Sequence, residues 1–483
     1  MSQKGFLIYI MIRTISLKVI NTYKKCIYIT PLPQALDIAS DYAKIVYKYQ
    51  LKIYDLSDIE KFLIQKTQAT LDLNRGINES KKGTLFVVSC PLSSGGHTRL
   101  MENLSKMLPE KNDLLVTRVF ENNLEDVLYR YFSGIKKCFR KRSQNSVDHI
   151  NTLFKELVGY EKIVLNIHPD DISTVIACSL IKKLNKDVKV YFVNHADHVA
   201  SFGATISDYW FEISLFGKEI DNKRGITGIR SFIGIPIDKP DTMFFNPVKY
   251  PSINSVKNFF TSGWLGKYQP YRKASIVPLF RKLLLIKGDI SITIIGPSLR
   301  GYIWIWPFYF KNNKNIKIIS HLPYEEYINL TEKSDYFIDS FPMPGGTAFV
   351  EQFIQGIPCI GQKSAFYGYT PLELIKSKTI GEIIELLRAP PTPSQLHTIQ
   401  KKIYEVHAFS CVKERFIRCI KNGEVSKNPM LSYRKDLETG ISVPSRHINL
   451  LFSPKLILFR IFLKVFFLKI RYLNLSNSKN AKS

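Results

Sequence analysis

The stretch Asp339-Ser-Phe-Pro-Met-Pro-Gly-Gly-Thr-Ala-Phe-Val-Glu351 predicts the end of a strand, a turn and the start of a helix. Residues 336–339 form a short apolar run typical of a strand, and the glycines let the backbone approach a ligand closely. We expect Thr347 to cap the helix, so that a hydroxyl and free backbone N–H groups face one spot suited to phosphate. Glu351 follows one turn later. The alternative is an ordinary strand–helix turn of an α/β domain, in which Gly and Thr serve geometry alone.

Strands and helices alternate on both sides of this turn. Between residues 250 and 388 we predict strands at 258–262, 291–296, 315–319, 336–339 and 358–361, and helices at 275–287 and 324–333. A similar unit spans 83–237, with strands at 84–89, 113–119, 162–167, 188–193, 209–214 and 231–236, and helices at 99–108 and 172–184. Near-continuous apolar strands that alternate with helices favour parallel sheets. The fold class is therefore α/β, with two tandem Rossmann-like domains that face each other across a ligand cleft.

Three segments lie outside these two units. Residues 1–82 form an N-terminal extension, in which 26–30 is typical of a strand and 33–49 of a helix; a βαβ-like unit and a helical cap both fit. Residues 389–443 form a terminal helical segment with a helix at about 395–420. Residues 444–483 form an apolar tail with eight Lys/Arg and no acid. We expect this tail to contact an anionic membrane surface, or to pack as a terminal helix on the protein or a partner.

The composition narrows the functional class. The chain has 483 residues, 45% hydrophobic content and a net charge of +27. This length suggests two to four domains. The charge fits a nucleic acid, a membrane or an acidic substrate, or simply a Lys-rich composition. Because no nucleic-acid-binding signature is present, we expect no nucleic-acid partner.

The cysteines and the N-terminus bear on the compartment. Seven cysteines are scattered without any Cys-x-x-Cys spacing, which favours a reducing compartment and neither a zinc site nor a disulfide framework. The apolar run 5–12 is too short to span a bilayer. We predict a cytoplasmic protein, with peripheral attachment at the inner face of the cell membrane through the tail.

Polar side chains follow strands in both units. In the second unit, Gly263 and Lys267 follow the strand at 258–262, where a lysine suits a diphosphate leaving group, and Gly296 ends the next strand. A solvated lysine is the alternative. In the first unit, the candidates are His97, in the glycine-bearing loop 93–99, and His195, Asp197 and His198, which follow the strand at 188–193.

Histidine is a general base near neutral pH, and a neighbouring carboxylate can orient it. A metal site would need a further ligand, such as His168 or Asp170. Capping of the loop is a third interpretation of these residues. We favour a sugar or acceptor site and expect no metal.

The order of these motifs resembles the donor domain of two-Rossmann (GT-B) glycosyltransferases over about residues 250–365. The matching motifs are Gly263, Lys267, Gly296, the segment 322–327, Asp335-Tyr-Phe-Ile-Asp339, Gly345-Gly346-Thr347, Glu351 and Gly356-Ile-Pro358. The resemblance implies a UDP- or GDP-linked sugar as substrate, without a cofactor. It places Lys267 on the diphosphate, Gly345 to Thr347 on a phosphate and Glu351 on the ribose. Met343 stands where many retaining members carry Glu, which favours inversion.

The resemblance further implies a hexosyl- or N-acetylhexosaminyl-transferase. Its pattern is similar to the O-GlcNAc-transferase and adhesin N-glycosyltransferase branch, and to glycosyltransferases of bacterial surface-polysaccharide loci, such as those for lipopolysaccharide or capsule. We favour the second group, with a glycan or lipid-linked glycan as acceptor, because no helical repeat precedes the two units. The alternatives are a nucleotide-sugar 2-epimerase, a protein-modifying glycosyltransferase and a non-catalytic basic binding protein.

Overall fold

A computed structural model of the chain describes residues 20–49, 51–70, 81–92, 96–110, 112–121, 124–270, 274–296, 298–320 and 322–440. Within these residues, the first sheet has seven parallel strands in the order β3-β2-β1-β4-β5-β6-β7. The strands are β1 (Lys81–Val88), β2 (Asn112–Val116), β3 (Phe132–Lys137), β4 (Tyr160–Asn166), β5 (Lys189–Val193), β6 (Tyr209–Glu212) and β7 (Ile229–Phe232). The expected tail and loop residues 93–95 lie outside the described residues.

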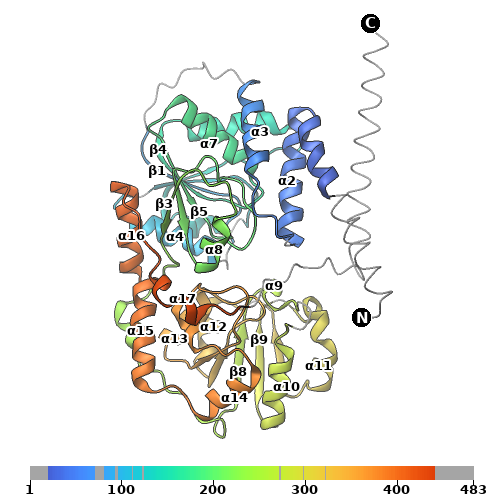
Figure 1. Ribbon diagram of the computed structural model, residues 1–483, viewed down its shortest axis with the longest axis vertical. Helices are drawn as coiled ribbons and strands as arrows, with labels where there is room; N and C mark the ends of the chain where they lie inside the picture. The colour runs from blue at the N-terminus through green and yellow to red at the C-terminus, as the bar shows by residue number, and fades with distance from the viewer. Residues whose placement is uncertain are drawn as a thin grey trace.

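The second sheet repeats the same topology on a smaller scale. Its five described strands are parallel and have the order β10-β9-β8-β11-β12. They are β8 (Asn258–Ser262), β9 (Ser291–Ile295), β10 (Ile316–Ile319), β11 (Tyr336–Ile338) and β12 (Cys359–Ile360). Figure 1 shows the first sheet in the upper half of the molecule and the second in the lower half. The prediction of two Rossmann-like α/β units is confirmed.

Helices cover both sheets. Those of the first domain are α4 (Gly96–Met107), α5 (Glu125–Leu128), α6 (Ser146–Leu157), α7 (Ile172–Leu184) and α8 (Leu215–Asp221). Those of the second are α9 (Leu265–Tyr268), α10 (Val277–Ile286), α11 (Trp306–Lys311), α12 (Tyr324–Thr331), α13 (Thr347–Ile354) and α14 (Ile380–Arg388). Short 3₁₀ turns are η2 (Asp241–Phe245), η3 (Leu299–Ile305), η4 (Pro371–Ile375) and η5 (Pro429–Tyr433), with α17 (Arg434–Leu437) after the last. Strand order reverses between β1 and β4 and between β8 and β11, where such folds bind ligands.

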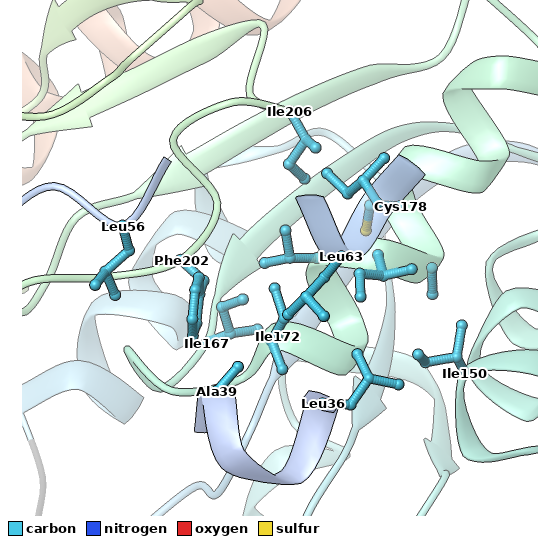
Figure 2. Packing of buried hydrophobic residues seen from close by; sticks show 14 of the residues in the cluster. Leu36, Ala39, Leu56, Leu63, Ile150, Ile167, Ile172, Cys178, Phe202 and Ile206 are labelled. Atoms are coloured by element: carbon cyan, nitrogen blue, oxygen red, sulfur yellow. The ribbon is translucent and has the colours of Figure 1, made fainter. Parts of the chain in front are cut away.

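The described part of the N-terminal extension is a helical cap on the first domain. Residues 20–29 are helical, and α2 (Leu32–Tyr49) and α3 (Ser57–Gln68) follow. The strand expected at 26–30 is therefore wrong. Burial of Tyr23, Cys26 and Ile27, at helical spacing, outweighs the strand preference of these residue types. Figure 2 shows the resulting core between α2, α3, α6 and α7, with the labelled residues Leu36, Ala39, Leu63, Ile150, Ile172 and Cys178.

The C-terminal segment returns to the first domain. The single helix expected at 395–420 is wrong, because the chain bends at Ala408 (φ −56°, ψ 136°) between α15 (Pro393–His407) and α16 (Phe409–Asn422). The bend is held by a backbone hydrogen bond from the Ile237 N–H to the His407 carbonyl, 2.8 Å. Helix α15 packs on the second domain and α16 buries Val412 and Phe416 in the core of the first. The two helices therefore bridge both domains (Figure 1).

Candidate active site

The turns after β8 and β9 pack directly against each other. The Gly263 N–H donates to the Ile295 carbonyl, 3.0 Å. A Cβ on Gly296, whose φ is +152°, would lie 2.1 Å from the Gly263 carbonyl oxygen, so no other residue fits there without moving that backbone. The predicted glycines Gly263 and Gly296 thus set the backbone from which Lys267, on α9, projects.

The turn after β11 is shaped by one buried carboxylate. Asp339 is 2% exposed, and its Oδ1 accepts hydrogen bonds from the backbone N–H groups of Ser340 (2.8 Å) and Gly345 (2.9 Å). Its Oδ2 pairs with the Lys376 Nζ at 2.6 Å. A buried ion pair holds its geometry because the loss of either partner would leave an unpaired charge in the interior. Sequence reasoning missed Lys376, because nothing local distinguishes a lysine after η4 from a solvated one.

The Lys267 ammonium lies beside this turn. Its Nζ is 3.7 Å from the position that a Cβ of Gly345 would occupy. Burial lowers the pKa of Lys267, with a further decrease from Lys376 and an opposing effect of Asp339. Within the described residues, no hydrogen bond or ion pair is recorded for this ammonium. A desolvated cation without a direct partner is well placed to receive an anion.

Helix α13 begins at Thr347, so the expected capping role of Thr347 is wrong. Gly346 is the N-cap and no side chain caps the helix, because the preceding Gly-Gly turn leads straight into helical backbone. The backbone N–H groups of the first turn are thus left without a capping side chain. The helix dipole makes this end favourable for an anion.

The first domain comes close to this end of α13. A Cβ on Gly96, which opens α4, would lie 3.9 Å from the Thr347 Oγ1, and one on Gly346 would lie 3.1 Å from Ile235. The Arg99 Nη1 is 3.9 Å from the Glu351 Oε1. Burial raises the pKa of Glu351, and Arg99 opposes this effect. The proposed ribose ligand therefore faces a cation of the opposite domain.

Two of the predicted histidines, His97 and His195, lie together at the edge of the first sheet. Their rings stack with centroids 5.5 Å apart. The His97 Nε2 is 3.0 Å from the Cys90 carbonyl, which fixes a proton on that nitrogen and leaves Nδ1 as the basic one. Burial lowers the pKa of His97, and burial together with His97 lowers the pKa of His195 to about 3. Both rings are neutral at pH 7 and can accept a proton.

Asp197 and His198 lie in a different environment. Asp197 is buried; its Oδ1 accepts a hydrogen bond from the Tyr369 hydroxyl at 2.6 Å and its Oδ2 one from Ser214. Tyr369 belongs to the second domain, so this carboxylate links the domains. The His198 Nδ1 is 3.7 Å from the Asp197 Oδ1. The Asp197 carboxylate is thus close to the His198 imidazole, and it accepts its hydrogen bonds from the hydroxyls of Tyr369 and Ser214.

A third histidine of this edge is held by a carboxylate. The His168 Nδ1 contacts the Asp170 Oδ1, and Asp170 also forms a bidentate pair with Arg118, at 3.1 and 3.0 Å. The Ser40 hydroxyl, from α2, donates to Asp170 at 3.0 Å. Burial raises the pKa of Asp170, but the contacts with His168 and Arg118 outweigh it and hold the pKa well below the usual range. The N-terminal extension therefore supports this side of the site.

In the ranges that the structure describes, no group of three or more His, Cys, Asp or Glu side chains is placed to hold a metal ion. None of the described helices combines the length and the apolar character needed to cross a membrane.

Comparisons with known proteins place this fold. No protein-family model and no curated protein matches the chain. HepE from Anabaena, in complex with UDP and glucose, superposes with a TM-score of 0.55 at 10% identity, over 70% of this chain and 99% of HepE. The same protein with UDP-glucose gives a TM-score of 0.53 over the same shares. An O-GlcNAc transferase mutant from Thermobaculum terrenum gives a TM-score of 0.48 at 13% identity, over 84% of this chain and 79% of that one.

The chain has the GT-B fold. The two parallel sheets, their strand orders and these superpositions define this architecture, and the resemblance predicted from the donor motifs is confirmed at the level of fold. At 10% identity the likeness extends no further than the fold.

Proposed function

We propose that the chain is a glycosyltransferase that moves a sugar from a nucleotide sugar, UDP- or GDP-linked, to a glycan or lipid-linked glycan acceptor, without a metal. Its donor domain spans 250–388 and its acceptor domain 83–237. One observation carries the proposal: the Lys267 ammonium and the uncapped start of α13 converge on the Gly345 turn, where the second sheet reverses its strand order. HepE from Anabaena forms complexes with UDP and with UDP-glucose, which supports the donor class.

The donor side supplies fixed positive charge. Lys267 offsets the charge that develops on the leaving diphosphate, and the N–H groups of residues 346 and 347 bind a phosphate, while the Gly345 N–H stays on the Asp339 carboxylate. Glu351 binds the ribose hydroxyls after Arg99 turns from its carboxylate towards the phosphates. Asp339 and Lys376 hold the turn without touching the substrate. Each charged side chain of the turn thus has a single role.

The opposite edge supplies the base. The Cys90 carbonyl holds His97 in the tautomer with a free Nδ1, and His195 stacks against that ring. The acceptor oxygen forms a bond to the anomeric carbon while the bond from this carbon to the phosphate oxygen breaks. The hydroxyl proton passes to the His97 Nδ1, and the nucleoside diphosphate leaves with the bonding electrons. This direct displacement inverts the anomeric centre, in keeping with Met343 at the position of a retaining acid.

We assign the acceptor to bacterial surface-glycan assembly, such as lipopolysaccharide or capsule, with transfer of a hexose or an N-acetylhexosamine. The basic tail 444–483 would keep the enzyme at the inner face of the cell membrane, where a lipid-linked acceptor lies. This placement rests on the charge of the tail.

A thermal-shift screen tests the donor site. Purified full-length protein is titrated with UDP, GDP, ADP and their sugars, and at least one uridine or guanosine diphosphate should raise Tm. Lys267→Ala should abolish that shift. Lys363→Ala is the matched control, since Lys363 lies in the same domain and donates to the Asp436 carbonyl. Absence of any shift with all nucleotides would refute the proposal.

Release of the nucleotide tests the reaction. A glycosyltransferase releases UDP or GDP in step with acceptor glycosylation, whereas a 2-epimerase releases none that depends on acceptor. Product analysis on lipid-linked glycan and on peptide acceptors separates the two transferase alternatives.

A further inference from the structure

Four large apolar side chains are exposed on one flank of the second domain. They are Leu285 on α10 (81% exposed), Ile303 in η3 (65%), Phe310 on α11 (63%) and Trp306 on α11 (36%). Scattered apolar side chains on a surface are ordinary, but several on adjacent elements indicate an interaction site. We call these residues and the charged ones around them the α10–α11 face.

The α10–α11 face is continuous. Helices α10 and α11 are packed together through the stacked rings of Phe280 and Phe308, whose centroids are 6.3 Å apart. Arg281 lies over Phe308 at 5.7 Å, and the rings of Trp306 and Phe310 are 6.5 Å apart. Figure 1 shows the two helices side by side at the lower right. Their inner sides fill the core of the domain, so their outer sides form one surface.

The segment that carries most of these apolar side chains is rich in basic residues. Residues 277–317 contain seven Lys/Arg and one acid. The basic residues are Arg281, Lys282, Lys287, Arg300, Lys311, Lys314 and Lys317. The single acid, Asp289, is 3.8 Å from the Lys287 Nζ. Acids reappear on α14, which packs beside α10 and pairs Glu385 with Arg388, so that helix bounds the face.

We propose that the α10–α11 face docks on an anionic lipid bilayer, with Trp306, Phe310, Ile303 and Leu285 inserted at the headgroup level. Tryptophan prefers this depth, and lysine and arginine beside it pair with anionic headgroups. The Trp306 indole N–H already donates to the Leu299 carbonyl at 2.9 Å, so its ring enters an apolar layer without an unpaired donor. Leu285 and Ile303 offer no ring on which a base could stack, which favours a lipid surface over a single-stranded nucleic acid.

This contact is separate from the one assigned to the tail, and it does not depend on catalysis. It uses folded elements of the donor domain. It would therefore fix the orientation of that domain relative to the bilayer, whereas a tail alone would only raise the local concentration of the enzyme.

Vesicle binding by the full chain tests the proposal. Co-sedimentation is measured with vesicles of 30% phosphatidylglycerol in phosphatidylcholine and with phosphatidylcholine alone. The wild type should bind the anionic vesicles, and both Trp306→Ser/Phe310→Ser and Lys311→Gln/Lys314→Gln should bind at least tenfold more weakly. The matched control is Val119→Ser/Val425→Ser, two apolar residues that are 73% and 47% exposed elsewhere. Circular dichroism and Tm confirm that each variant is folded.

A second readout excludes a contribution from the tail. Brominated acyl chains should quench the fluorescence of the wild type, and Trp306→Phe should lose most of this quenching while its binding is retained. Equal binding of the wild type and both double variants, or quenching that persists in Trp306→Phe, would overturn the proposal. A sedimentation coefficient that changes in the double variants would instead identify a second copy of the chain as the occupant of the face. Weaker binding of the double variants to single-stranded RNA would identify a nucleic acid as the occupant. Either result would also overturn the proposal.

Discussion

The turn at 339–351 and the histidine edge of the first sheet face each other, but one carries fixed charges and the other carries neutral rings. The turn concentrates fixed charges: Asp339 and Lys376 are paired and buried, and the Lys267 ammonium stands next to them with no hydrogen bond or ion pair to any residue that the structure describes. The edge instead keeps His97 and His195 neutral by burial and by stacking. One side is suited to hold charge and the other to accept a proton. The following experiments separate these two designs.

Removal of the donor cation should have the largest effect. Lys267→Ala should lower kcat by about 10³-fold, which corresponds to about 4 kcal/mol, because a preorganised charge on the leaving group is lost. Nucleotide release measured at saturating acceptor gives this value. Lys363→Ala should keep activity within twofold, and an equal loss in both variants would show that Lys267 has no special role.

Loss of the base should come second. His97→Ala should lower kcat by about 10²-fold and leave nucleotide affinity unchanged, because a general base acts on the acceptor and not on the donor. Isothermal titration with the nucleotide, next to steady-state kinetics, separates the two effects. His195→Asn should lose less than His97→Ala, since only the stacking partner is removed. The reverse order would make His195 the base.

The neutral edge should also appear in the pH dependence of stability. Burial lowers the pKa of His195 to about 3 from its ordinary value of 6.5. Below pH 6.5 the unfolded chain therefore binds a proton that the folded chain does not, and the free energy of unfolding falls as pH decreases towards 3. The expected loss is about 1.4 kcal/mol per pH unit. His195→Asn should remove this component.

Urea unfolding at pH 7, 6 and 5 measures that difference. The exposed His397 on α15 provides the matched control, and His397→Asn should follow the wild-type profile. Parallel profiles for the wild type and His195→Asn would contradict the assignment of a neutral, buried ring.

The smallest effect is expected at the proposed ribose ligand. Glu351→Gln should raise the KM for the nucleotide sugar about tenfold and change kcat little, because one charge-assisted hydrogen bond is weakened in both ground and transition states. Glu332→Gln, an exposed acid after α12, is the control. A fall in kcat with unchanged KM would assign Glu351 to chemistry instead of binding.

The strands of the second sheet were predicted to within about two residues, because each is a short apolar run, and β8, β9 and β12 are followed directly by glycine. Strand β3 was missed, since Phe132-Ser-Gly-Ile-Lys-Lys137 lies at the sheet edge and is largely accessible to solvent. The strand at 26–30 failed for a different reason. Cys26 and Ile27 are buried by tertiary contacts while Ile29 is exposed, as on a helix with one face covered, and local preference does not encode these contacts.

The candidate site was predictable only where it follows strand ends. Lys267 and Gly345 follow such ends, and the Lys267 Nζ lies 3.7 Å from the position that a Cβ of Gly345 would occupy. Lys376 and Arg99 reach the same region from a loop and from the opposite domain, and their partners are distant in sequence. The Thr347 cap failed because Gly346 already allows helical backbone one residue earlier.

The bend at Ala408 has a mechanical consequence. The chain passes between the domains twice, after Ile237 and at Ala408, and the two passages are adjacent because the Ile237 N–H bonds to the His407 carbonyl and a β-bridge joins Ile237 to Ala408. The two crossings of the chain between the domains are therefore held together at one point. A rotation of one domain against the other about this point would keep both crossings intact, but it would break contacts that join the domains elsewhere, such as the hydrogen bond from the Tyr369 hydroxyl to Asp197.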